Sequence, residues 1–194
     1  MSQPVRFLAF AGSLRRESFN RRLIHTLVAG AKGAGAEVEL IELRDFQLPI
    51  YDADLEAEGM PDTVHRLQEK MAVADGLLIA TPEYNGSIPA LLKNTLDWMS
   101  RPQANGDSGV ELFKGKIAGI SSASPGGLGG LRSLLILRDT LSKLDMWVAP
   151  SQMAIGSAFS AFDESGALID ERRRMAVEGV AKQAVEAAIR FRGA

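Results

Sequence analysis

The stretch FLAFAGSLRRESFNRRLI, residues 7–24, decides the fold and raises the main question of the sequence. It begins as an apolar strand and ends as an amphipathic helix. A plain corner between a strand and a helix needs only a glycine and a capping residue. This corner instead carries hydroxyl groups, an amide and an arginine, at Gly12, Ser13, Arg15, Ser18 and Asn20.

Strand and helix patterns alternate along the rest of the chain. Strands are predicted at 5–10, 37–43, 76–81, 116–122 and 146–151, and helices at 19–34, from Pro61, at 89–99, 131–144 and 169–191. Parallel strands need such crossovers, which are right-handed. The pattern therefore predicts an α/β fold, a three-layer doubly wound sheet of five parallel strands. No internal repeat or dividing linker is visible, so we expect a single domain over 1–194, with a surface loop at 103–109.

Composition narrows the classes of function. The 194 residues are 46% apolar and carry a formal net charge of −2, which argues against nucleic-acid binding and a polybasic membrane surface. The chain has no cysteine and only His25 and His65 as histidines, so no metal site is predicted and both histidines are expected at the surface. The opening MSQPVRF lacks the pattern of a signal peptide, and we expect a cytoplasmic protein.

Three polar or glycine-rich corners follow the first, third and fourth predicted strands, at 12–20, 82–87 and 122–130. Open parallel sheets bind ligands outside the carboxyl ends of their strands. The three corners are therefore expected to meet at one edge of the sheet and to form a binding site.

The first corner has the parts of a phosphate site. A helix N-terminus offers unpaired N–H groups, and Arg15 adds a forked cation suited to phosphate oxygens. Arg16, Arg21 and Arg22 raise the local positive potential, although each is expected to be solvated. An ordinary N-cap at Ser18 is the alternative. The corner lacks the glycine patterns of dinucleotide and nucleoside-triphosphate sites, so a monophosphate ligand fits better.

The other two corners are weaker signals. Tyr84 offers an aromatic face, and Asn85-Gly86 is a turn pair that adopts positive φ angles. Such a loop is suited to the edge of a flat heterocycle, or it is simply a tight turn before a helix. The glycines after Pro125 permit close backbone approach to a ligand, or they form a flexible crossover. For Glu83 there are two possible roles. Its carboxylate contacts the ligand or a partner subunit, or it is simply an exposed acid in the loop.

Two motifs together carry a family resemblance. GSLRRESFN at 12–20 and TPEYNGSIPALLKNTLDWMSRP at 81–102 resemble the NADPH-dependent FMN reductase family, the flavodoxin-like group with quinone, azo-dye and chromate reductases. The likeness extends to about Pro150. The resemblance implies the strand order 2-1-3-4-5 and FMN held without a covalent bond.

The resemblance also implies the site residues. By motif, the FMN phosphate would be held by Ser13, Arg15, Ser18, Phe19 and Asn20. The isoalloxazine would be lined by Pro82, Glu83, Tyr84 and Asn85, and its other side closed by Ser124 and Gly126. No catalytic acid, base or nucleophile is assigned, because the flavin carries the chemistry.

The function implied is a ping-pong oxidoreductase. NADPH or NADH would reduce FMN, and small acceptors such as quinones, azo compounds, flavins or metal oxyanions would take the electrons. The alternatives are a flavodoxin-type electron carrier, against which the near-neutral charge argues, and a scaffold that has lost its ligand. The resemblance also implies a homodimer or homotetramer. Trp98, Met99 and the apolar run at 134–137 are either part of such an interface or buried within one chain.

Overall fold

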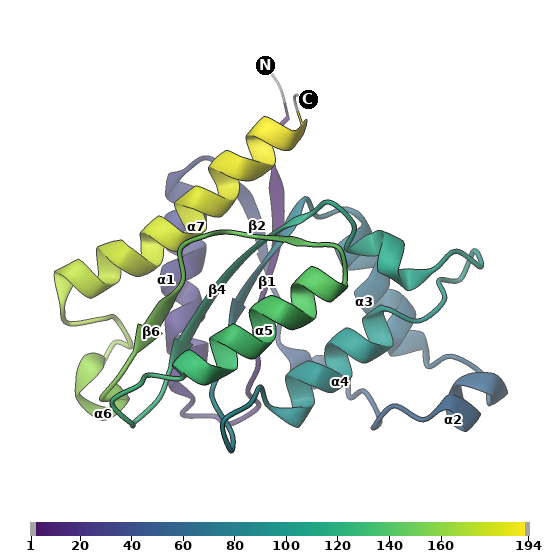
Figure 1. The fold of residues 1–194 in the computed structure, drawn as a ribbon, viewed down its shortest axis with the longest axis horizontal. Helices are drawn as coiled ribbons and strands as arrows, with labels where there is room; N and C mark the ends of the chain where they lie inside the picture. The colour runs from purple at the N-terminus through teal and green to yellow at the C-terminus, as the bar shows by residue number, and fades with distance from the viewer. Residues whose placement is uncertain (1–2, 193–194) are drawn as a thin grey trace.

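The computed structural model describes residues 3–192 and contains a parallel sheet in the order β2-β1-β3-β4-β5, with β6 also paired to β4 (Figure 1). Every strand pair is parallel. The strands are β1 Arg6–Ala11, β2 Glu37–Leu40, β3 Gly76–Ala80, β4 Ile117–Ala123, β5 Trp147–Val148 and β6 Met153–Ile155. The predicted strand order and doubly wound α/β class are confirmed.

Helices cover both faces of the sheet, so its strands are buried on both sides (Figure 1). In β1, Phe7 and Ala9 face the layer of α1 and α7, whereas Leu8 and Phe10 face the layer of α3, α4 and α5. The helices are α1 Phe19–Gly33, α2 Ala53–Glu58, α3 Asp62–Ala72, α4 Ala90–Met99, α5 Leu131–Lys143, α6 Ala158–Ala161 and α7 Glu171–Arg192, with 3-10 turns at Leu43–Asp45 and Gly109–Leu112. Within residues 3–192, no helix has the length and apolar composition needed to cross a bilayer.

The fifth strand position differs from the prediction, because it consists of two short segments. β5 pairs with the start of β4 and β6 with its end. Pro150, which has no backbone N–H, lies in the interval between them. Arg138 of α5 compensates there: its guanidinium donates to the carbonyls of Val148 at 3.2 Å and Ala149 at 2.8 Å. The predicted strand at 146–151 is thus both shorter and followed by a second one.

Most of the residues that hinted at oligomerisation are buried within the chain. Trp98 is fully buried within the chain: its Nε1 donates to the Pro49 carbonyl at 2.8 Å, and its ring packs edge-on against Tyr51. Met99 is also buried, and so are the first and last residues of the run 134–137. Of the hinted residues, only Leu135 and Ile136 remain exposed.

Close contact between α1 and α7 depends on one glycine. A Cβ at Gly30 would lie 2.5 Å from the carbonyl oxygen of Glu178. Any side chain at this position would push α7 away from α1, since real Cβ atoms do not approach a backbone so closely. The glycine therefore fixes how α7 lies along α1 on this face of the sheet.

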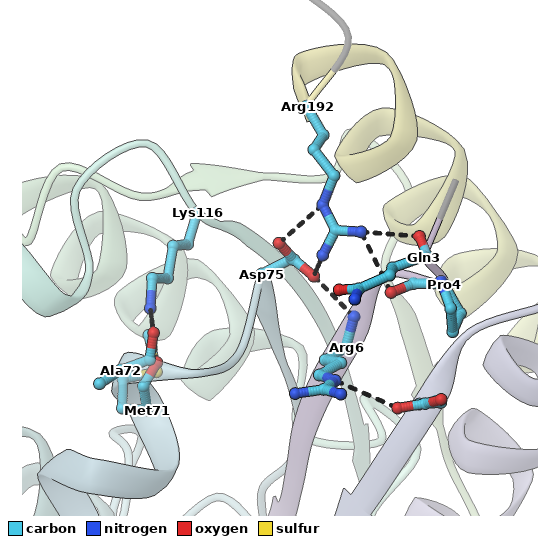
Figure 2. A network of polar contacts seen from close by, with 9 residues as sticks. Gln3, Pro4, Arg6, Met71, Ala72, Asp75, Lys116 and Arg192 are labelled. Carbon is cyan, nitrogen blue, oxygen red and sulfur yellow. Dashed lines mark hydrogen bonds and ion pairs between the residues drawn. The ribbon is translucent and has the colours of Figure 1, made fainter. Parts of the chain in front are cut away.

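Polar contacts fasten the amino edge of the sheet, opposite the three corners (Figure 2). The carboxylate of Asp75, just before β3, accepts the Arg6 backbone N–H at 2.6 Å and pairs with Arg192 at the end of α7. Arg192 also donates to the carbonyls of Gln3 and Pro4, at 2.8 and 3.1 Å. The end of α7 is thereby tied to the strands β1 and β3.

Lys116, just before β4, lies at the same edge (Figure 2). Its Nζ donates to the carbonyls of Met71 and Ala72 at the end of α3. These are the last two carbonyls of the helix, and that of Met71 also accepts the backbone N–H of Ala74 at 3.2 Å, so the lysine adds to the C-terminal cap. Burial of the ammonium group lowers the pKa of Lys116 from 10.5 to about 8.

Replacing Lys116 by methionine should change how stability depends on pH. Between pH 8 and 10.5 the unfolded chain holds this proton and the folded chain has lost it, so Lys116 makes the unfolding free energy rise with pH. The wild-type value minus the Lys116→Met value should therefore increase over this window, by at most about 3 kcal/mol. Urea unfolding at pH 7.5 to 10 measures the difference. The exposed Lys114→Met is the matched control, and a flat difference for Lys116→Met contradicts the prediction.

Candidate functional site

The three corners meet at the carboxyl edge of the sheet, as expected. They enclose a cavity of about 290 Å³ that lies beyond the ends of β1, β3 and β4. Of the predicted site residues, only Asn85 and Gly126 are not part of its wall. The wall consists of Ser13, Arg15, Ser18, Phe19, Asn20, Pro82, Glu83, Tyr84, Ala123, Ser124 and Pro125.

Two buried serines form the floor of the first corner. Ser18 is the N-cap of α1, and its Oγ accepts the backbone N–H of Asn20 at 3.2 Å. Ser13 Oγ accepts the backbone N–H of Arg15 at 3.3 Å. Each hydroxyl keeps its own hydrogen for a further acceptor. The first turn of α1 carries no acidic residue, so the positive end of this helix faces the corner without a neutralising carboxylate.

An aromatic ring supports Arg15. The Arg15 guanidinium carbon lies 5.3 Å from the centre of the Phe19 ring, within the range of a cation–π contact. Phe19 is itself stacked on Phe162, with ring centres 6.0 Å apart. Arg15 forms no ion pair within residues 3–192. Its forked donors are therefore free to bind an anion in the cavity.

Asn20 joins the first corner to the third. Its Nδ2 donates to the Ala123 carbonyl at 2.9 Å, and its Oδ1 accepts the Ala123 N–H at 2.8 Å. These two residues are 103 positions apart, and Asn20 is 2% exposed. The side chain lines the cavity as predicted, but its geometry is that of a residue that holds α1 against the end of β4.

The second corner is a two-residue turn. Tyr84 and Ser87 exchange two backbone hydrogen bonds of 3.0 Å each. Asn85 and Gly86 have φ angles of 51° and 79°, which confirms the predicted positive values and is typical of a type I′ turn. Tyr84 is 54% exposed at the rim of the cavity, and Asn85 lies at the tip of the turn. The loop thus presents an aromatic ring at the entrance.

Glu83 is neither an exposed loop acid nor a free group in the cavity. Arg132, in the first turn of α5, pairs with its carboxylate and also donates its backbone N–H at 3.2 Å. The hydrogen bonds and charge of Arg132 hold the pKa of Glu83 below its usual value. Sequence reasoning missed Arg132, which is 49 residues away, because a pairing between a loop and a distant helix leaves no local pattern.

In the glycine-rich third corner, residues 125–128 are exposed, whereas Gly129 and Gly130 are packed against their surroundings. Gly129 and Gly130 have φ angles of +63° and +90°, and a Cβ on Gly129 would lie 2.6 Å from the backbone nitrogen of Gly156. Ser122 Oγ donates to the Gly129 carbonyl at 2.7 Å. These glycines serve close packing rather than a flexible crossover. Gly126 accepts the N–H of Gly129 at 3.1 Å and does not reach the cavity wall.

The donors of the cavity suit a phosphorylated flat ring such as FMN. Hydroxyls, a helix N-terminus and a guanidinium gather on one side, and Tyr84 and Pro82 form the rim on the other. Over residues 3–192, no group of three His, Cys, Asp or Glu side chains is placed to hold a metal ion. His25 is exposed, and His65 Nδ1 lies 3.2 Å from Gln68 Oε1.

Comparison with known proteins also identifies relatives that are FMN and quinone reductases. A family model described as NADPH-dependent FMN reductase matches residues 5–160. An NAD(P)H-dependent FMN reductase of Pseudomonas aeruginosa is 37% identical over 179 residues, 92% of each chain. A quinone reductase of Escherichia coli K12 is 37% identical over 175 residues, 88% of each. A similar solved structure is that of FerB, a flavoenzyme NAD(P)H:(acceptor) oxidoreductase from Paracoccus denitrificans. The two structures superpose over 96% of this chain and 98% of FerB, with a TM-score of 0.81 and 29% sequence identity.

Removal of the Asn20 amide should loosen the link between the first and third corners. In Asn20→Ala the N–H and carbonyl of Ala123 lose their partners, which should lower the unfolding free energy by about 1–3 kcal/mol. Hydrogen exchange at the Ala123 amide should also accelerate. Gln68→Ala is the control, because it removes an equally buried amide that bonds Met99 and Arg101 elsewhere. If the Ala123 amide hydrogen exchanges no faster in Asn20→Ala than in the control, the Asn20 side chain does not hold the first corner against β4.

Proposed function

This chain belongs to the NADPH-dependent FMN reductase family, and from that premise we propose that it oxidises NAD(P)H through bound FMN and passes the electrons to small quinones. The observation that carries the proposal is the single cavity in which a phosphate-type donor set and an open aromatic rim meet. We further propose that the chain works as one FMN-binding domain, since both hydrophobic cores pack on the same sheet.

In this proposal the first corner binds the phosphate. The Ser13 and Ser18 hydroxyls and the Arg15 guanidinium would donate hydrogen bonds to it, while Phe19 keeps Arg15 in place. Asn20 would hold the corner against β4, and Pro82, Tyr84 and Ser124 would bound the ring. Asn85 and Gly126, which are outside the cavity wall, would act through the shape of their loops. FMN supplies the redox chemistry when bound, by accepting a hydride from NAD(P)H and delivering electrons to an acceptor.

In this proposal the protein binds FMN, orients its ring and leaves one side of the site open to substrates. Glu83 stays ionised and paired with Arg132, so it serves to hold the second corner rather than to transfer a proton. The exposed ring of Tyr84 leaves the entrance accessible, and donor and acceptor would use this entrance in turn. An open site of this kind selects acceptors by flatness and by redox potential more than by detailed shape. Azo compounds and free flavins are therefore further proposed acceptors through their flat rings, and metal oxyanions through their redox potential. We place the activity in the cytoplasm, where reduced nicotinamide is available.

The absorbance spectrum of the purified protein, saturated with FMN, tests the proposal. Anaerobic addition of NADPH should bleach the flavin at about one equivalent per chain, and a quinone should restore the spectrum. A flavodoxin-type carrier would bind FMN but stay oxidised without a separate reductase. A protein that remains colourless after incubation with FMN would contradict the proposal altogether.

Arg15→Ala should weaken FMN binding by about 1.5–3 kcal/mol, the usual contribution of a hydrogen bond to a charged group. This corresponds to about a 10- to 150-fold higher Kd in a fluorescence titration. Arg66→Ala is a matched control, because Arg66 also lies over a phenylalanine ring, that of Phe46 at 5.5 Å, but on α3 and outside the cavity wall. An unchanged Kd in Arg15→Ala would remove Arg15 from the phosphate site.

We also propose that the chain forms a homodimer or homotetramer through the exposed face of α5. This face carries Leu131, Leu135 and Ile136, which are 39%, 55% and 38% exposed, beside the Glu83–Arg132 pair. Leu135→Glu should shift the mass measured by light scattering toward the monomer, whereas Ile189→Glu on α7 should leave it unchanged. A monomeric wild type, or an unaltered mass in Leu135→Glu, would exclude this face as the interface.

A further inference from the structure

We propose that Lys116 is a modification site, at which small acyl phosphates transfer their acyl group to the Nζ atom. The site lies at the amino edge of the sheet, whereas the cavity that would hold FMN lies at the carboxyl edge. The inference is therefore independent of the redox reaction proposed above. It rests on a cavity lined by this side chain and on the groups that surround its amine.

The cavity beside Lys116 has a volume of about 330 Å³. It is bounded by the end of α3 with the residues that follow it, by residues 114–117 and by the end of α7. Part of the wall is apolar, because Ile117 and Ala188 are buried there and Phe191 is half-exposed. Since Lys116 lines this cavity, a small molecule from solvent can reach its side chain.

Backbone hydrogen bonds hold Lys116 in place. Its N–H donates to the Phe113 carbonyl at 3.0 Å, and its carbonyl accepts the N–H of Trp147 at 2.9 Å. The preceding residue, Gly115, donates its N–H to the Asp145 carbonyl at 2.8 Å. The lysine side chain therefore starts from a fixed point just before β4, and its far end is held by α3.

The end of α3 holds the amine and leaves it able to react. Lys116 Nζ donates to the carbonyl oxygens of Met71 and Ala72. An ammonium group has three hydrogens and no lone pair, whereas a neutral amine has two hydrogens and one lone pair. The two carbonyls can accept both hydrogens of the neutral amine. Its lone pair then remains free to attack an electrophile.

The surroundings of Lys116 favour the neutral amine. Within residues 3–192 its ammonium group forms no ion pair, because Asp75 of the cavity wall is bound to Arg192 and to the Arg6 backbone (Figure 2). Burial lowers the pKa of Lys116 to about 8, although the charge of Asp75 acts in the opposite direction. At pH 7.5 about a quarter of these amines are then neutral, against about 0.1% for an ordinary lysine. Desolvated lysines of this kind are activated nucleophiles.

The charges around the cavity suit an anionic acyl donor. Besides Lys116, the wall carries the cations Lys114 and Arg192 and the carboxylate of Asp75. Arg192 and Asp75 are bound to each other. Lys114 is held only by Glu111, at 3.4 Å and between two side chains that are more than half exposed, and such a pair contributes little. A phosphate group can therefore replace Glu111 as the partner of Lys114.

The reaction is an acyl transfer that needs no further reactant. The Nζ lone pair attacks the carbonyl carbon of the acyl phosphate, and an N–C bond forms. The C–O bond to the phosphate breaks, and the phosphate leaves with the electron pair and takes up the proton that the nitrogen loses. The product amide has one N–H and no charge, so it can bond only one of the two carbonyls of α3. The modification would thereby weaken the end of α3 and leave the candidate FMN site unaltered.

Acetylation of the full-length, FMN-saturated protein with acetyl phosphate tests the site. Mass spectrometry after digestion gives the acetylation rate at each lysine. At pH 7.5 Lys116 should react about tenfold faster than Lys143, the matched control, which lies in the last turn of α5 and is exposed. The rate at Lys116 should level off above about pH 8.5, whereas the rate at Lys143 should continue to rise.

A neutral acyl donor, N-acetylimidazole, tests the part played by the phosphate. In Lys114→Met, acetylation of Lys116 by acetyl phosphate should fall about threefold, the effect expected of one exposed ion pair. Acetylation of Lys116 by N-acetylimidazole should be unchanged in the same variant. Lys182→Met is the control, because it removes a lysine of α7 that is outside the cavity wall.

Several results would overturn the inference. These are equal rates at Lys116 and Lys143 at pH 7.5, parallel pH profiles at the two lysines, and a preference for Lys116 that persists in protein unfolded by urea. If Lys114→Met affects acetylation by the two donors equally, the assignment to acyl phosphates is wrong.

Discussion

Two hydrogen bonds between the Asn20 side chain and the Ala123 backbone are the interaction on which the candidate site depends. They connect the first turn of α1 to the last residue of β4, and so fix the corner with the serines against the corner with the glycines. Parallel strands bring these corners to one edge, but the sheet alone does not set their spacing. A buried amide that is bonded through both its oxygen and its nitrogen sets it.

The two edges of the sheet have different roles: the amino edge carries stabilising contacts, and the carboxyl edge carries the candidate binding site. At the amino edge, the charged side chains form structural contacts. Asp75 and Arg192 form an ion pair, and Lys116 donates hydrogen bonds to the last carbonyls of α3. At the carboxyl edge, Arg15 and Arg16 have no carboxylate partner within residues 3–192, and the start of α1 has no acidic residue. Uncompensated positive charge is therefore concentrated where an anionic ligand would bind, and not where the fold is fastened.

The sequence allowed much of this to be predicted, for physical reasons. Helix and strand periods are local, so the strands, long helices and three corners could be read directly, and the strand order followed from the family resemblance. What could not be read depends on contacts between distant residues. The Glu83–Arg132 pair joins the second corner to the first turn of α5. The gap between β5 and β6 is filled by Arg138 from α5, and Trp98 is covered by Tyr51 and Pro49.

The central claim is that the corner between β1 and α1 holds the phosphate of FMN. A crystal structure of the protein grown with excess FMN tests it most directly. The account predicts phosphate oxygens within hydrogen-bond distance of the Ser13 and Ser18 hydroxyls and the Arg15 guanidinium, with the ring extending toward Tyr84. A structure in which FMN occupies another part of the protein, or in which this corner stays empty at saturating FMN, would contradict the account.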